Sequence, residues 1–166
     1  MLGFLSDSYH HAGQMADGLG LSTWPKQIVH ADWHPGNMLF DGDRVIAVID
    51  YDSARFLPRV VDVANGALQF SIVGGGDDVL QWPVELDGAR FRRFVKGYDG
   101  VSLLTDAEVR TMPWLMIEAL VAEAVFPIAM TGHFGRVEGA PFLQMVRRKV
   151  QWIQKSVDQL VELAEG

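Results

Sequence analysis

Two adjoining stretches of sequence decide the fold. Residues 30–37 read His-Ala-Asp-Trp-His-Pro-Gly-Asn, and residues 38–52 read Met-Leu-Phe-Asp-Gly-Asp-Arg-Val-Ile-Ala-Val-Ile-Asp-Tyr-Asp. The first stretch holds an acid, an amide and two imidazoles within eight positions. The second holds two apolar runs around the turn residues 41–44, a pattern that predicts a β-hairpin over residues 38–49. Because both runs are nearly continuous in apolar residues, we expect this hairpin to be buried on both faces, under helices.

The hairpin geometry brings three polar side chains together. A hairpin that turns near residues 42–43 makes neighbours of Asn37 and Asp50, which should lie roughly 5–8 Å apart across its open end. Asp32 lies on the loop just before that same end. Oxygen ligands of this kind suit a hard cation such as Mg²⁺, which keeps waters and phosphate oxygens in its shell. The spacing therefore predicts a metal site formed by Asp32, Asn37 and Asp50.

The rest of the chain has mostly helical periodicity. Thr105 and Glu108 form a capping-box pattern that opens a long apolar helix to about Met130, which Pro127 should kink or end. Arg147, Arg148 and Lys149 are expected on a solvated helix face. The other predicted elements are a short strand at residues 28–29 and helices at residues 4–18, 60–72, 91–98 and 142–163.

The sequence motifs of this chain resemble those of the aminoglycoside phosphotransferase and choline kinase superfamily. They consist of His-x-Asp-x-His-Pro-Gly-Asn at residues 30–37 and Val-Ile-Asp-Tyr-Asp at residues 48–52, with an acid at Asp62 after Pro58. In kinase-like phosphotransferases a loop Asp accepts the substrate hydroxyl proton, an Asn five residues later holds Mg²⁺, and a further Asp holds Mg²⁺. The resemblance thus implies Asp32 as the catalytic base, Asn37 and Asp50 as Mg²⁺ ligands, and ATP as the phosphate donor.

The resemblance also suggests roles for the neighbouring side chains. Asp62 would anchor the catalytic loop by accepting hydrogen bonds from its backbone, and His30 would be a hydrogen-bonded structural imidazole. His34 would orient the loop or contact the phosphates of the cofactor. Asp52 would support the metal ligands from behind or be a solvated turn acid, two roles that the sequence does not separate.

The implied fold is mainly α with a small β-hairpin, as in the C-terminal lobe of a protein-kinase-like fold. We expect residues 1–166 to form this single lobe, with the motifs at 28–64 and a helical subdomain at 85–166. The N-terminal lobe, with its glycine-rich loop and strand Lys, is not recognised, and the glycines at residues 74–76 stand in the wrong place for it. The chain alone should therefore lack phosphotransfer and dimerise through the surface that faces such a lobe.

Composition limits the partners. Lys plus Arg number 14 and Asp plus Glu number 21, so a net charge of −7 argues against nucleic acid. There is no cysteine, and Glu118 and Glu123 interrupt the longest apolar run, so we expect neither thiolate metal sites nor a membrane span. We expect the protein to be cytoplasmic. The resemblance implies that its substrate is a small hydroxylated molecule such as an aminoglycoside, choline or homoserine.

Two other functions stay open from the sequence. His30, Asp32 and His34 alternate along the chain and could bind Zn²⁺ or Mn²⁺ as a hydrolase site, although Pro35 and Gly36 favour a loop there. Alternatively, the chain is a non-catalytic, truncated lobe that acts as a binding or interaction module.

Overall fold

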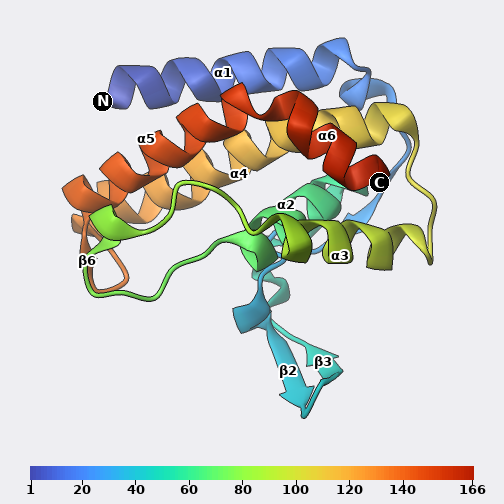
Figure 1. The fold of residues 1–166 in the computed structure, drawn as a ribbon, viewed down its shortest axis with the longest axis horizontal. Helices are drawn as coiled ribbons and strands as arrows, with labels where there is room; N and C mark the ends of the chain where they lie inside the picture. The colour runs from blue at the N-terminus through green and yellow to red at the C-terminus, as the bar shows by residue number, and fades with distance from the viewer.

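Helices make up most of the structure, a computed structural model that describes all of residues 1–166. The α-helices are α1 (Leu2–Gly18), α2 (Val60–Ser71), α3 (Gly88–Asp99), α4 (Asp106–Thr131), α5 (Gly139–Lys155) and α6 (Val157–Glu165). Strands form three two-stranded antiparallel sheets, so the expected mainly helical fold with small β elements is confirmed at this level. Figure 1 shows α1, α4 and α5 stacked along one side, with α2 and α3 beneath them.

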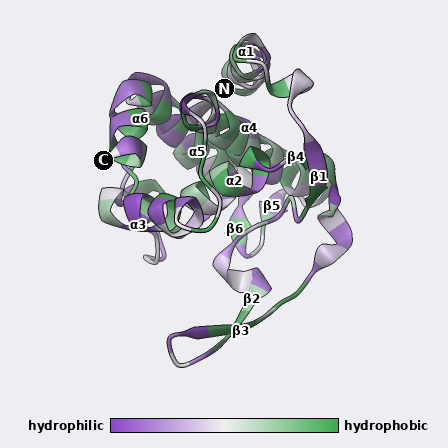
Figure 2. Ribbon diagram, turned by 90° about the vertical axis from the view of Figure 1, so that its right-hand side faces the viewer, coloured by the Kyte–Doolittle hydropathy of each residue, from purple (hydrophilic) through white to green (hydrophobic).

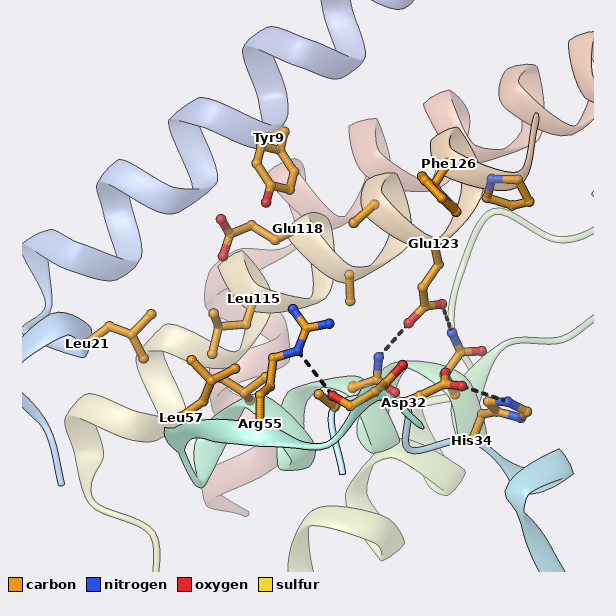
Figure 3. Close-up of a pocket in the computed structure, with 18 of the residues that line it drawn as sticks. Tyr9, Leu21, Asp32, His34, Arg55, Leu57, Leu115, Glu118, Glu123 and Phe126 are labelled. Atoms are coloured by element: carbon orange, nitrogen blue, oxygen red, sulfur yellow. Dashed lines mark hydrogen bonds and ion pairs between the residues drawn. The ribbon is translucent and has the colours of Figure 1, made fainter. Parts of the chain in front are cut away.

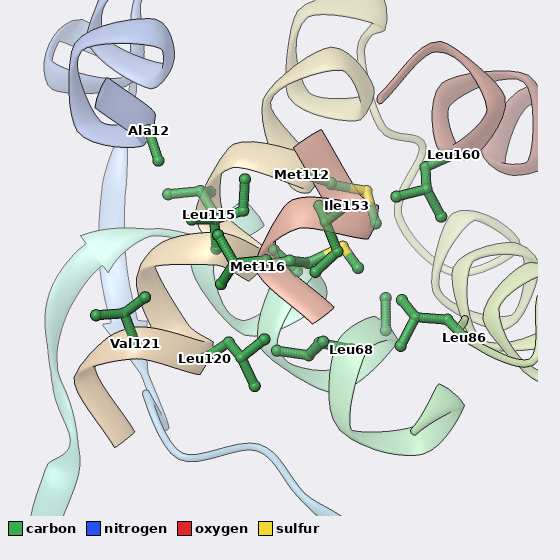
Figure 4. Close-up of a cluster of buried hydrophobic side chains, with 14 of the residues drawn as sticks. Ala12, Leu68, Leu86, Met112, Leu115, Met116, Leu120, Val121, Ile153 and Leu160 are labelled. Atoms are coloured by element: carbon green, nitrogen blue, oxygen red, sulfur yellow. The ribbon is translucent and has the colours of Figure 1, made fainter. Parts of the chain in front are cut away.

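The core lies around α4, which packs against α1, α2, α5 and α6. Met112, Met116 and Ile117 of α4 are fully buried. Figure 4 shows Met112 and Met116 among side chains from the surrounding helices, such as Leu68, Ile153 and Leu160. Full burial of one such side chain is worth about 1.5–3 kcal/mol relative to exposure. By length and composition alone α4 could also cross a membrane, contrary to the expectation from Glu118 and Glu123. That is weak evidence, because the central helix of a folded domain passes the same test.

The capping box that opens α4 is confirmed. The Glu108 backbone N–H donates to Thr105 Oγ1 (3.2 Å), and the Thr105 backbone N–H donates to Glu108 Oε2 (2.8 Å). These bonds satisfy donors that would otherwise be unpaired at the helix N-terminus. Pro127 does not end the helix, which runs on to Thr131 and stops at Gly132, where φ is +79°.

The strands frame the segment that carries the polar motifs. Strand β1 (Lys26–Val29) pairs with β4 (Arg55–Pro58), a strand that the sequence analysis missed. The predicted hairpin is present as β2 (Met38–Asp41) and β3 (Arg44–Val48), with a bulge between Leu39 and Phe40. The minor pair β5 (His133–Phe134) and β6 (Val137–Glu138) connects α4 to α5.

The expectation that the hairpin is buried on both faces was wrong. Leu39, Phe40 and Ile46 are about half exposed, at 46%, 49% and 59%. The hairpin projects from the helical body in Figure 1, and Figure 2 shows hydrophobic residues along it. A high content of apolar residues indicates that burial of a strand is favourable. It does not indicate which part of the molecule, or which partner, covers the strand.

Two further expectations about the C-terminal helices need correction. The single predicted helix over residues 142–163 is two helices that meet at Ser156. Lys149, expected in solvent, is fully buried, and its Nζ donates to the Pro83 carbonyl (2.7 Å). Helical periodicity placed Lys149 beside exposed Arg147 and Arg148, whereas the loop that covers it comes from residues 79–83.

Candidate active site

The loop of residues 30–34 is anchored by α2. The Asp62 carboxylate, in the first turn of α2, accepts the backbone N–H of His30 at Oδ2 and that of Ala31 at Oδ1, both at 2.7 Å. Ala31 has a φ of +61°, a conformation that residues other than glycine rarely adopt. The two charge-assisted hydrogen bonds offset the cost of that strained backbone and fix the position of the next residue, Asp32.

Asp32 and Asn37 are in direct contact. Asn37 Nδ2 donates to the Asp32 backbone carbonyl (2.9 Å) and to Asp32 Oδ2 (3.1 Å). Asn37 is 6% exposed, whereas the Asp32 side chain keeps one third of its surface in solvent. Since the amide nitrogen is committed to Asp32, Asn37 Oδ1 stays available as an oxygen donor to a cation.

His34 lies on the other side of Asp32. Its Nδ1 accepts the Gly36 backbone N–H (3.0 Å), so the neutral ring carries its proton on Nε2, 3.6 Å from Asp32 Oδ2. A Cβ at position 36 would lie 2.8 Å from the His34 ring, which explains the glycine there. The ring is one third exposed and faces the same space as the Asp32 carboxylate.

The open end of the hairpin adjoins this loop. The Ile49 backbone N–H donates to the Asn37 carbonyl (2.9 Å), and His30 Nε2 lies 2.9 Å from the Ile49 carbonyl. Asp50 follows at once, in the left-handed region with φ of +64°, and both Asp50 and Asp52 are exposed. The backbone thus brings Asp50 beside Asn37, as the hairpin geometry predicts, although no hydrogen bond joins their side chains.

The donor set of the loop and the hairpin end suits a hard cation. Asp32, Asn37 and Asp50 supply carboxylate and amide oxygens, the ligands that Mg²⁺ prefers. Nowhere in the chain do three or more His, Cys, Asp or Glu side chains gather as a metal-binding group. The alternative of a hydrolase metal centre at His30, Asp32 and His34 is not favoured, because Nε2 of buried His30 lies 2.9 Å from the Ile49 carbonyl.

A cleft of about 990 Å³ opens above Asp32 and His34, between the loop, β4 and α4 (Figure 3). Its polar lining includes Arg55, Asn65, Glu118 and Glu123, none of which the sequence analysis assigned to the site. The available signal was that Glu118 and Glu123 lie within the apolar stretch of α4, but the sequence analysis interpreted them only as interruptions of an apolar run.

Two carboxyl groups of α4 that line the cleft resist ionisation. Burial, together with the charge of Asp32, raises the pKa of Glu123 to about 7, against the lowering effect of amide donors from Asn65 and Gln69. Burial and the charge of Asp17 raise the pKa of Glu118. Neither acid forms an ion pair, so a cationic group on a bound molecule would stabilise their ionised forms.

Comparison with known proteins agrees with a phosphoryl-transfer site. An Asp followed five residues later by an Asn, with a further Asp after a strand, is a spacing found in kinase-like phosphotransferases. A model of the phosphotransferase enzyme family matches residues 12–118, which contain the loop, the hairpin, α2 and the first half of α4. The match covers more than half of the chain, so the chain belongs to this family, and the resemblance found in the sequence is confirmed.

Curated relatives point the same way. The chain is 32% identical over 107 residues to a homoserine kinase of Rhizobium rhizogenes, a match covering 60% of this chain and 29% of that protein. It is 29% identical over 92 residues to a homoserine kinase of Methylobacillus flagellatus, with 55% and 26% covered. The matched part thus spans less than a third of the length of either relative.

Proposed function

We propose that this chain is the C-terminal lobe of an ATP-dependent small-molecule kinase, which binds the phosphate acceptor and contributes the catalytic base. The observation that carries the proposal is the Asp32–Asn37 contact within a loop anchored by Asp62, at the floor of a large cleft. Membership of the phosphotransferase enzyme family and the two homoserine kinase relatives support it.

In the proposed reaction Asp32 orients the acceptor hydroxyl and accepts its proton. The hydroxyl oxygen forms a bond to the γ-phosphorus of ATP, the bond to the β–γ bridging oxygen breaks, and ADP leaves. Asn37 and Asp50 would hold Mg²⁺, which supplies charge neutralisation on the phosphates when bound. His34 Nε2–H, beside the Asp32 carboxylate, would donate to a phosphate oxygen, and His30 and Asp62 keep the loop in place.

The remaining assignments follow from the same proposal. Asp52 is exposed and has no hydrogen-bond partner in the structure, so we assign it a supporting role toward the metal only. The acceptor would be a small hydroxylated molecule, with the homoserine of the relatives' names, aminoglycosides and choline as the candidates. Most of the rate enhancement would come from positioning and charge neutralisation.

The test measures ADP release from MgATP with kanamycin, choline and L-homoserine as acceptors. The chain alone should give none, and micromolar affinity for ATP would contradict that part of the proposal. In the protein that joins this lobe to an ATP-binding lobe, Asp32→Asn should lower kcat at least a thousandfold. Asp43→Asn, in the hairpin turn, is the matched control and should leave kcat unchanged, while turnover retained by Asp32→Asn would refute the assignment.

A further inference from the structure

Beside its carboxylates, the cleft contains one arginine. Arg55 extends from β4 toward α4 (Figure 3), and its only hydrogen bond runs from Nε to the Ser53 carbonyl (3.1 Å). It forms no ion pair, so both terminal guanidinium nitrogens stay free. A guanidinium with two free nitrogens matches a carboxylate in a bidentate geometry, which a point charge such as an ammonium cannot do.

The facing wall accepts hydrogen bonds. Glu123 receives Asn65 Nδ2 at Oε1 (2.5 Å) and Gln69 Nε2 at Oε2, and it has no cationic partner. Asn65 also lines the cleft and is 4% exposed, and its Oδ1 has no hydrogen-bond partner at all. A buried acceptor without a donor is costly, so a donor-rich cation brought into the cleft would satisfy Asn65 Oδ1 and give Glu123 a charged partner.

We propose that the cleft binds its acceptor as a zwitterion, namely an α-amino acid with a side-chain hydroxyl. Arg55 takes the α-carboxylate, Glu123 and Asn65 take the α-ammonium, and the hydroxyl faces Asp32. This inference rests on the proposed function for the role of Asp32, but the charge pattern that carries it does not. A cleft that binds only cations has no use for Arg55, and choline and aminoglycosides, which carry no carboxylate, would leave it unpaired.

Four matched probes separate the three contacts. L-Homoserine carries ammonium, carboxylate and hydroxyl, 3-aminopropan-1-ol lacks the carboxylate, 4-hydroxybutyrate lacks the ammonium, and L-2-aminobutyrate lacks the hydroxyl. Binding of each to the 166-residue chain is measured by calorimetry or ligand-observed NMR at pH 8. We expect L-homoserine to bind about tenfold or more tightly than 3-aminopropan-1-ol or 4-hydroxybutyrate, which corresponds to about 1.4 kcal/mol per charged contact.

Variants then assign each contact to a residue. Arg55→Gln should abolish the preference for L-homoserine over 3-aminopropan-1-ol, and Glu123→Gln should abolish its preference over 4-hydroxybutyrate. Arg44→Gln on the hairpin and Glu162→Gln on α6 remove the same charges outside the cleft and should change neither ratio. Equal binding of L-homoserine and 3-aminopropan-1-ol to the unmodified chain would overturn the proposal. Loss of the ammonium preference in Glu118→Gln instead of Glu123→Gln would overturn the assignment to Glu123.

The outcome is distinguishable from failure of the proposed function. If the probes follow the predicted pattern but the joined protein releases no ADP, the zwitterion site stands and the kinase assignment fails. If ADP release depends on Asp32 and the best acceptor is choline or kanamycin, the kinase stands and the zwitterion site fails.

Discussion

The Asn37 side chain donates through one nitrogen to both the backbone carbonyl and the carboxylate of Asp32, at 2.9 and 3.1 Å. This contact holds the acid that we assign as base in one orientation, because a buried amide loses free energy if it turns away from its acceptors. It also determines which atom of Asn37 is left for a metal, namely Oδ1.

Asn37→Asp should convert this contact into a repulsion. Two ionised carboxylates about 3 Å apart repel each other, so we expect the free energy of unfolding to fall by about 2 kcal/mol at pH 7. The loss should shrink as pH falls and the pair takes up a proton, and millimolar Mg²⁺ should reduce it at pH 7. Urea unfolding at pH 5 and 7, with and without Mg²⁺, provides the measurement. A variant as stable as the unmodified chain at pH 7 would show that the two side chains are not held together.

Asp62→Ala should detach the loop of residues 30–34 from α2. It leaves the N–H groups of His30 and Ala31 without an acceptor, and Ala31 is held at a positive φ. We expect a loss of about 3 kcal/mol in chemical denaturation and faster amide exchange at residues 30–34. Asp77→Ala, which removes an exposed loop acid, should have little effect. Unchanged amide exchange at Ala31 would be evidence against the anchor.

Glu108→Gln should weaken the junction of α2 with α4. Burial opposes ionisation of Glu108, but hydrogen bonds from Arg59 (2.7 and 2.8 Å) hold its pKa below the ordinary value. A lowered folded-state pKa contributes stability that is present above the unfolded-state pKa and is lost as pH falls through the folded-state value. We expect a loss of about 2 kcal/mol at pH 7 that disappears toward pH 3, measured by thermal unfolding against pH. A loss independent of pH would assign the effect to packing alone.

Lys149 should make stability rise with pH. Burial, together with the charge of Arg148, lowers the pKa of Lys149 to about 8, against the raising effect of Glu85. Between pH 8 and 10.5 the unfolded chain binds more protons than the folded one, so unfolding becomes harder as pH rises. Relative to Lys149→Met, the unmodified chain should gain up to about 3 kcal/mol over that interval. The exposed-site variant Lys155→Met keeps Lys149 and should show the same rise in stability with pH as the unmodified chain. Parallel pH profiles for Lys149→Met and the unmodified chain would contradict the prediction.

The projecting hairpin should drive self-association of the isolated chain. Ile28, Phe40, Ile46 and Phe56 are 49–78% exposed on the hairpin and on the neighbouring β1–β4 pair. Apolar surface gathered in this way tends to find a partner, so we expect a concentration-dependent dimer in sedimentation velocity. Ile46→Lys should shift the chain toward monomer, whereas Val101→Lys, at a position 91% exposed far along the chain, should not. A clean monomer at high concentration would rule out the dimer.

Several helices and strands could be predicted from signals that lie within a few residues of one another in the sequence. Turn residues around Gly42 set the hairpin, Thr105 and Glu108 set the start of α4, and helical periodicity located the main helices. Hairpin geometry also placed Asp50 beside Asn37, because residues at the open end of an antiparallel pair must meet. The motifs at residues 30–37 and 48–52, together with Asp62, were enough to identify the family, since their polar residues lie close together along the chain.

Long-range packing determines which side chains meet and which are covered, and this became clear only from the three-dimensional structure. It buried Lys149 under a loop that lies more than sixty residues earlier, and it left the apolar hairpin uncovered. It carried Arg55 to one wall of the cleft and Glu123 to the other, although 68 positions separate them, through the pairing of β4 with β1 and the packing of α4 on α2. Such placements depend on long-range packing, and an isolated Arg or Glu in the sequence looks the same whether it lines a cleft or faces bulk water.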